Sequence, residues 1–307
     1  MNKPNSTRVS SWQPSSDIKS HSGSLPTADA DFFMPPQQTI GELISADTTL
    51  KTSTGNPMPE LLRLTIVIVA SGLSFAIILF GFHNAIFALV AAGVNGWLAW
   101  FCTRFHHTCS YIGSKGLIKY ELVNSRSAMP KESLLLFTDA HSLYAKTIRN
   151  YTNGFYTGTT YTYTWKKNSG NEYVISGNYQ SEKSSPKDGD PWHFANTSES
   201  VWSSYLLSTL DAQIDRDGYV EFPMGGALQA VRVGQGFMEF VTRKDGSQRV
   251  MVADMRDISL GSGTFQFKHQ DARWWSGKGK YSFEYANIPN ARVFLICLGE
   301  LAGISWD

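Results

Sequence analysis

Charged side chains are missing from one long stretch of the chain. The sequence has no Lys, Arg, Asp or Glu from Leu64 to Phe101. A single helix of that length would far exceed the roughly 20 residues that cross a bilayer core, so one span is excluded. The polar pair His83-Asn84 interrupts the stretch. It predicts a transmembrane hairpin of two helices, Leu64–Phe82 and Asn84–Phe101, within a segment 60–104.

Cysteine is scarce, and neither sign of charge dominates. The three cysteines, Cys102, Cys109 and Cys297, are widely spaced and odd in number, which excludes a disulfide framework and favours a reducing compartment for the folded part. The 27 Lys and Arg residues nearly balance the 26 Asp and Glu residues. We therefore expect no nucleic-acid partner.

Catalytic motifs are also missing. The chain has no P-loop, no Gly-x-Gly-x-x-Gly between a strand and a helix, no His-Glu-x-x-His and no Gly-x-Ser-x-Gly. Cys102, His106, His107 and Cys109 are ligand types that zinc prefers, but no second pair follows at zinc-finger spacing. We expect no metal, no cofactor and no enzymatic activity.

Residues 1–59 are poor in apolar side chains and rich in Ser, Thr, Pro, Gln and Asp. This composition predicts a disordered tail, and it contains no secretory signal. Near its end, Thr39 is placed to cap a short helix with Ile40, Leu43 and Ile44 on one face. That patch is either a docking motif for a partner or a slightly apolar linker.

Positive residues flank the apolar stretch but not its turn. Arg63 precedes the first predicted helix, and Arg104 and Lys115 follow the second. The positive-inside rule predicts a two-span membrane protein with both termini in the cytoplasm. Ala92 and Gly96 form a small-xxx-small pair beside the polar Asn95, a pattern that allows close helix packing, within the hairpin or in a homo-oligomer.

From residue 110 the apolar pattern changes to a period of two. Thr159–Trp165 alternates strictly, which predicts a strand. The other predicted strands are Leu117–Leu122, Ser133–Phe137, Leu143–Arg149 and Tyr173–Ser176. A helical stripe then covers Ser198–Ile214, with Thr197 or Ser198 as its cap.

The chain then repeats itself. Tyr111–Tyr120 is similar to Val231–Phe240, and a second amphipathic helix is predicted near Asn290–Leu301. We expect an α+β fold, mainly antiparallel β, with two units at 110–215 and 216–307. Each unit has several strands and one closing C-terminal helix.

A Tyr-rich run within the first unit supports a resemblance. Its residues are Tyr151, Gly154, Tyr156, Gly158, Thr159, Tyr161, Thr162, Tyr163 and Trp165. The region from Ser110 to Gly303 resembles the pleckstrin-homology-like superfold, and the chain is similar to a group of uncharacterised two-span membrane proteins that carry this run. The resemblance implies tandem pleckstrin-homology-like units and the bacterial inner membrane, and it implies no established activity.

A candidate binding patch combines basic and aromatic residues. Its members are Arg273, Trp274, Trp275, Lys278 and Lys280. Such a patch suits a membrane surface or an anionic partner, and it equally suits an edge hairpin whose aromatics complete the core.

The leading hypothesis is a non-enzymatic binding or scaffold protein, anchored in the bilayer and presenting its tandem units to a protein or lipid partner in the cytoplasm. One alternative is an accessory enzyme or transport component that uses the polar loop Asp188–His193. Another is a structural membrane oligomer that packs through the Ala92–Gly96 face.

Overall fold

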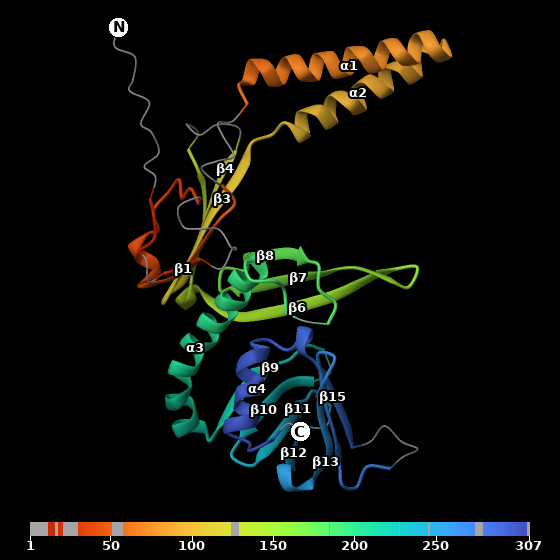
Figure 1. Ribbon diagram of the computed structural model, residues 1–307. Helices are drawn as coiled ribbons and strands as arrows, with labels where there is room; N and C mark the ends of the chain where they lie inside the picture. The colour runs from red at the N-terminus through yellow and green to blue at the C-terminus, as the bar shows by residue number, and fades with distance from the viewer. Residues whose placement is uncertain are drawn as a thin grey trace.

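The computed structural model describes residues 12–15, 18–20, 30–50, 58–123, 129–183, 185–226, 228–244, 246–273 and 279–305. Within these ranges the fold is α+β, with mostly antiparallel sheets and four α-helices (Figure 1). The predicted fold class is confirmed at this level.

Two long helices occupy the uncharged stretch. Helix α1 spans Glu60–Phe82 and helix α2 spans Ala85–Cys102. Between them His83 has a left-handed backbone (φ 51°), and the Asn84 side chain caps α2 by accepting two backbone N–H groups at 3.1 and 3.2 Å. Both helices are long and apolar enough to cross a membrane, although α1 begins earlier than predicted.

Arg63 closes the open end of this helical hairpin. Its side chain is buried, and its guanidinium lies 4.2 Å from the centroid of the Trp100 ring. It also donates to the Trp100 carbonyl oxygen at 3.2 Å and to Thr103 Oγ1 at 3.4 Å. A cation stacked on an aromatic ring at the C-terminus of α2 is stabilising on both counts.

A five-stranded sheet receives both ends of the helical hairpin. Its strands, in spatial order, are β1 (Lys19–Ser20), β2 (Leu43–Thr48), β3 (His106–Gly113), β4 (Gly116–Val123) and β5 (Lys131–Leu136). β1 is parallel to β2, and the other neighbours are antiparallel. β2 precedes the helices and β3 follows them, so α1 and α2 are inserted between two adjacent strands.

The segment before the helices corrects the prediction of a disordered tail over residues 30–50. Its strand β2 means that the first sheet begins before the helices, and the predicted boundary at residue 110 falls inside β3. Ile40 ends the short 3-10 helix η1 (Gln38–Ile40), and no docking helix with Leu43 and Ile44 forms. Phe32 is fully buried against this sheet. The local pattern does not indicate this strand because its hydrogen-bond partner, β3, lies beyond both helices.

A second sheet and a long helix complete the first unit. They are β6 (Ala140–Thr152), β7 (Phe155–Lys167), β8 (Glu172–Tyr179) and α3 (Pro191–Asp217). The predicted strand Thr159–Trp165 lies in β7. Helix α3 begins earlier than predicted, because Asp190 rather than Thr197 or Ser198 caps it, with Pro191 in its first turn.

The second unit repeats this order of elements. Its first sheet contains β9 (Tyr219–Pro223), β10 (Leu228–Gly234), β11 (Phe237–Thr242) and β12 (Gly246–Met251). Its second sheet contains β13 (Met255–Gly261), β14 (Thr264–His269) and β15 (Lys280–Glu284), and α4 (Ala291–Glu300) follows. Helix α4 falls within the predicted range. The short 3-10 helix η5 (Tyr285–Asn287) links β15 to α4.

Equivalent hydrogen bonds support the repeat. A 3-10 turn links the two sheets of each unit, η3 (Phe137–Asp139) in the first and η4 (Val252–Asp254) in the second. In the first unit the Phe137 N–H donates to the Lys115 carbonyl in the β3–β4 turn, and in the second unit the Val252 N–H donates to the Gly236 carbonyl in the β10–β11 turn, both at 2.9 Å.

The repeat is shifted by one residue from the predicted alignment. Gly113 faces Gly116 across the first turn, and Gly234 faces Phe237 across the second. Tyr111 therefore corresponds to Arg232 and not to Val231. A shift of one residue exchanges the two faces of a strand, so this correction decides which side chains are equivalent.

Helix α3 and one asparagine join the two units. The first half of α3 places Trp202 in the core of the first unit, while Leu210 and Ile214 pack against the core of the second. Asn290, at the start of α4, accepts from the Leu143 N–H at 2.8 Å and from Trp202 Nε1 at 2.9 Å through its Oδ1 atom. Contacts from both units therefore meet at this joint.

Candidate functional site

The outer face of the sheet β13–β14–β15 carries a row of three cations. In the strand register Arg256 lies opposite Lys268, and Lys268 lies opposite Lys280. We call these three residues the cationic row. Like charges directly opposite each other destabilise a sheet, so the row is not explained by fold stability.

The cationic row borders an open depression of about 450 Å³. Arg273 lines the same depression, and we call the row together with Arg273 the cationic face. Among the described residues that line it, Asp257 carries the single formal negative charge. The depression is therefore positive overall.

Asp257 sits at a bulge in β13. The register against β14 shifts between Arg256 and Ser259, and Asp257 has a left-handed backbone (φ 51°). Its Oδ2 atom accepts a hydrogen bond from Lys268 Nζ at 2.8 Å. This bond, with the positive charge of Lys268 and then of Arg256, lowers the pKa of Asp257. Asp257 therefore stays ionised near neutral pH and balances one of the four positive charges.

A row of neutral polar side chains lies beside the cations. Ser259, Gln266 and Ser282 face one another across the same three strands, and Gln266 Nε2 donates to Ser259 Oγ at 3.1 Å. They line a second depression of about 580 Å³ that also touches Lys268 and Lys280. The face thus offers hydroxyl and amide donors next to its charges, as anion recognition requires.

The structure describes two members of the predicted basic and aromatic patch. Arg273 and Lys280 both line the cationic face. Trp274, Trp275 and Lys278 lie outside the described residues. The sequence patch omitted Arg256 and Lys268. Their even spacing with Lys280 along a three-stranded meander was the signal that would have found them.

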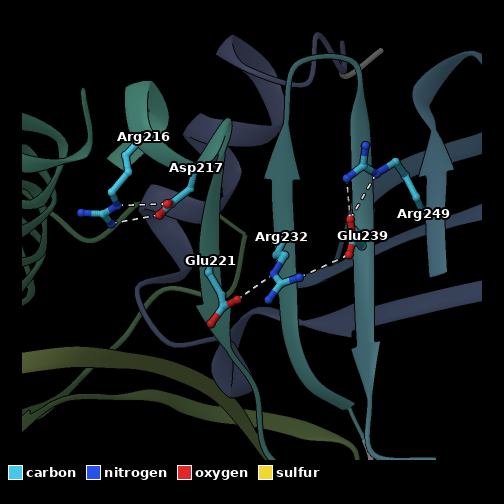
Figure 2. Close-up of polar contacts among 6 residues, drawn as sticks. All are labelled: Arg216, Asp217, Glu221, Arg232, Glu239 and Arg249. Atoms are coloured by element: carbon cyan, nitrogen blue, oxygen red, sulfur yellow. Dashed lines mark hydrogen bonds and ion pairs between the residues drawn. The ribbon is translucent and has the colours of Figure 1, made fainter. Parts of the chain in front are cut away.

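The charged face of the sheet β9–β12 differs from the cationic face because it combines positive and negative side chains in equal number (Figure 2). Arg232 Nε lies 2.7 Å from Glu221 Oε2, and Arg232 Nη1 lies 3.3 Å from Glu239 Oε1. Arg249 Nη2 lies 2.7 Å from Glu239 Oε2. The hydrogen bond from Arg249 is the main cause that lowers the pKa of Glu239. We call Glu221, Arg232, Glu239 and Arg249 the charge ladder. With two charges of each sign it attracts neither anions nor cations strongly.

A smaller cleft of about 290 Å³ lies where the two units meet. Glu199 of α3 is buried there, accepts from the Tyr285 hydroxyl at 2.7 Å and lies 3.8 Å from Arg292. Desolvation raises the pKa of Glu199, while Tyr285 and Arg292 oppose that shift. Both partners of the Glu199 carboxylate belong to the second unit, so these contacts connect the two units.

The predicted helix-packing residues do not share one environment. Gly96 is buried against α1, where a Cβ atom would lie 2.3 Å from Ser71 Oγ. Asn95 is exposed, and its amide donates to the Ala91 carbonyl of its own helix at 3.1 Å. Ala92 is partly buried. Gly96 therefore allows close contact inside the hairpin, and Asn95 makes no hydrogen bond across it among the described contacts.

The polar loop and the Cys/His cluster have structural contacts. Asp190 caps α3, and His193 Nε2 lies 3.2 and 3.1 Å from the carbonyl oxygens of Pro186 and Lys187. Cys109 is buried in the first sheet, whereas Cys102 is exposed at the end of α2. In the described part of the chain, no three His, Cys, Asp or Glu side chains are grouped closely enough to hold a metal ion.

The fold and the cationic face together define a class of protein. It has two repeated α+β units, a pair of long apolar helices inserted into the first unit, and one unbalanced basic face on the second. No family model matches the chain, and no curated protein is similar to it in sequence.

Proposed function

We propose that this protein is a membrane-anchored, non-enzymatic binding protein whose cationic face holds an anionic partner at the cytoplasmic side of the membrane. The observation that carries the proposal is the cationic row. Three positive side chains directly opposite one another repel. Asp257 balances one of the four positive charges of the cationic face, and a bound anion would offset the repulsion that is left. The neutral donors beside the row would add hydrogen bonds to the same ligand.

The inserted helices support the anchoring part of the proposal. Their ends lead into neighbouring strands, where the Thr49 N–H donates to the Thr108 carbonyl oxygen at 3.0 Å and Thr48 Oγ1 donates to the same oxygen at 3.1 Å. Two attachment points would hold the first unit close to the bilayer. Arg63 and Arg104 at the open end favour a cytoplasmic location for both termini.

The order of elements supports the pleckstrin-homology-like interpretation. In each unit a mostly antiparallel sheet is followed by a three-stranded antiparallel sheet and then by one helix. Two such units in series make a binding scaffold, and α3 and Asn290 fix one unit against the other.

Binding of soluble anions tests the cationic face. The full-length protein would be placed in phosphatidylcholine nanodiscs and titrated by calorimetry with an inositol polyphosphate and, separately, with a polyglutamate peptide. The variant R256Q/K280Q removes two cations from the row. The matched control R243Q/K244Q removes two exposed cations from the turn between β11 and β12.

We expect wild type and control to bind at least one probe with equal affinity, and the face variant to bind it at least about tenfold more weakly. Equal binding by all three proteins, or no binding of either anion by folded wild type, would contradict the proposal.

Cysteine labelling tests the anchoring. In a C102S background, single cysteines H83C and K244C would be exposed to a membrane-impermeant maleimide in sealed vesicles. We expect the two sites to be labelled from opposite sides of the membrane. Labelling of both from one side would show that the hairpin does not span.

A further inference from the structure

The cleft of about 290 Å³ between the two units is walled by both of them. Tyr163 of β7 and Glu199 of α3 line it from the first unit, and Glu284 and Tyr285 line it from the second. Among its described lining residues, the formal charges are those of Glu199 and Glu284, and both are negative. The charge of the lining therefore favours a cation over an anion as the occupant of the cleft.

One oxygen of the Glu199 carboxylate is open to a hydrogen-bond donor. The side chain is buried, and its Oε1 atom accepts from the Tyr285 hydroxyl at 2.7 Å. The Oε2 atom lies 3.8 Å from Arg292 Nη1, which is beyond hydrogen-bond distance. That nitrogen donates to Asn196 Oδ1 at 3.4 Å instead. Among the described contacts, Oε2 therefore accepts no hydrogen bond, and Arg292 compensates its charge only in part.

The Tyr163 hydroxyl is a second polar group without a partner in the cleft. Tyr163 is only 4% exposed, and the described contacts include no hydrogen bond to its hydroxyl. Burial, followed by the negative charge of Glu199, raises the pKa of Tyr163. The hydroxyl is therefore protonated and lies close enough to feel the same carboxylate. Buried polar groups without a hydrogen bond are uncommon and call for an explanation.

The rest of the lining suits a small polar ligand. The hydroxyls of Thr147, Ser262 and Thr264 also border the cleft. Ala145 lies opposite Tyr163 in the strand register, and its small side chain leaves space beside the phenol. Within the described ranges, His, Cys, Asp and Glu side chains do not gather in the groups of three that a metal ion would need. The cation that fits best is therefore an organic one.

An ammonium group matches the two open positions. It carries three N–H donors and a positive charge. Hydrogen bonds from a cation to a carboxylate are about twice as strong as those between neutral groups. One N–H group would donate to Glu199 Oε2 and another to the Tyr163 hydroxyl oxygen. The positive charge would also offset the desolvation of the Glu199 carboxylate.

We propose that the cleft between the two units binds a primary alkylammonium group, with Glu199 and Tyr163 accepting its N–H donors. The ligand would contact both units, so its binding would strengthen the joint between them. The group belongs either to a free amine or to a lysine side chain of a partner protein. This inference is independent of the cationic face and of the membrane anchoring.

Titration calorimetry of the full-length protein in phosphatidylcholine nanodiscs tests the proposal. The first probe is 1,4-diaminobutane, and the second is N-acetyl-lysine amide. The third is the fully N-methylated form of 1,4-diaminobutane, which keeps both positive charges and has no N–H donor. Empty nanodiscs give the background heat, and thermal unfolding shows that each variant is folded.

Two variants of similar shape remove the proposed contacts. E199Q removes the charge of the carboxylate, and Y163F removes the hydroxyl. We expect E199Q to bind the amine at least about tenfold more weakly than wild type, and Y163F at least about threefold more weakly.

The matched controls should bind the amine as wild type does. E300Q changes an exposed carboxylate of α4. Y144F removes a hydroxyl from β6, where Tyr144 pairs with Thr164 and so lies on the sheet face opposite to Tyr163.

The probes also distinguish the two sources of the ammonium group. Binding of the diamine alone would support a free amine as the ligand, and binding of the lysine amide alone would support a protein partner. The proposal would be overturned if folded wild type bound neither probe, or if E199Q and Y163F bound the amine as wild type does. Equally tight binding of the N-methylated form would also overturn it, because the site would then make no use of N–H donors.

Discussion

The first sheets of the two units share a strand register but present opposite chemistry on their outer faces. In the first unit the outer cross-strand row consists of Ala46, Tyr111, Ile118 and Leu134. In the second unit the equivalent row is the charge ladder of Glu221, Arg232, Glu239 and Arg249 (Figure 2). Because side chains alternate between the two faces of a strand, the same backbone arrangement can carry apolar residues on its outer face in one unit and charged residues there in the other.

The covering of each face explains the difference. In the first unit Phe32 and Trp12 pack on Tyr111, with ring centroids 5.8 and 5.4 Å away. Ile118 is fully buried beneath this N-terminal layer. In the second unit the side chains of Glu221 and Arg249 are 40% and 54% exposed. The apolar row of the first unit is therefore buried by the N-terminal segment, whereas the charge ladder of the second unit is solvated and needs no covering segment.

The inner faces differ in one row as well. In the second unit Phe222, Val231 and Phe240 belong to the core. The equivalent positions in the first unit are Asp47, Ser110 and Lys119. The first sheet thus places part of its apolar surface outside, and the N-terminal segment compensates by supplying a second core there.

Exchanging the central residues of the two outer rows should give the largest effect. Ile118→Glu places an unpaired carboxylate in a buried apolar layer, at a cost on the order of 4 kcal/mol in the free energy of unfolding. The reverse change, Glu239→Ile, should cost about 1 kcal/mol or less, because Arg232 keeps Glu221 and Arg249 is exposed. Thermal unfolding in nanodiscs measures both. Similar losses in the two variants would refute the idea that only one face is covered.

Removing the cover should be the next largest effect. Phe32→Ala deletes a fully buried aromatic side chain, and we expect a loss of about 3 kcal/mol. Limited proteolysis, which reports detachment of the N-terminal segment, should show faster cleavage before β2. The exposed Phe155→Ala change is the control and should leave the unfolding midpoint unchanged. A silent F32A variant would mean that the N-terminal layer does not hold the sheet.

Asp47 should make the first unit sensitive to pH. Burial raises the pKa of Asp47 from 3.8 to about 6, and its Oδ1 atom has no hydrogen-bond partner among the described residues. The folded state therefore binds the proton more tightly than the unfolded state. Stability from this group is fully present below about pH 4 and is lost as the pH rises through about 6.

Asp47→Asn should therefore stabilise the protein at pH 8, by about 1–3 kcal/mol, and have little effect at pH 4. Unfolding midpoints of wild type and variant at the two pH values measure this difference. The exposed carboxyl Asp211 on α3 provides the control, as Asp211→Asn. A D47N variant that loses stability at pH 8 would show that the carboxylate has a partner in the folded protein.

The comparison also explains which parts of the fold were predictable. The helical hairpin, the strand Thr159–Trp165 and the helix within Asn290–Leu301 follow from local patterns, and the structure has all three. Strand β2 does not, because Leu43–Thr48 is short, and its partner β3 lies beyond two inserted helices. An apolar pattern over Ile40–Ile44 suits a helix as well as a strand.

Prediction of the candidate site had the same limit. Arg273 and Lys280 are close in sequence and were found as a patch. Arg256 and Lys268 lie beside Lys280 only because of the strand register. The composition of a short segment of sequence does not reveal which strands pair or in which register. The repeat alignment was wrong by one residue because Tyr111 and Val231 are both apolar, whereas the register makes Arg232 the equivalent of Tyr111.

The smallest expected effect is in the charge ladder itself. Arg249→Gln removes the ion pair to Glu239 and the stacking of Arg249 over Phe237, whose centroid is 4.0 Å away. Because Arg249 is more than half exposed, we expect a loss of about 0.5 kcal/mol, which should shrink further in high salt. Unfolding midpoints at low and high salt measure this loss of stability, and Arg232→Gln, which breaks two ion pairs, is the stronger comparison.

A loss above about 2 kcal/mol that does not respond to salt would mean that the charge ladder is shielded from solvent. The outer face of the second unit would then be a covered face like that of the first, and the contrast between the two sheets would fail.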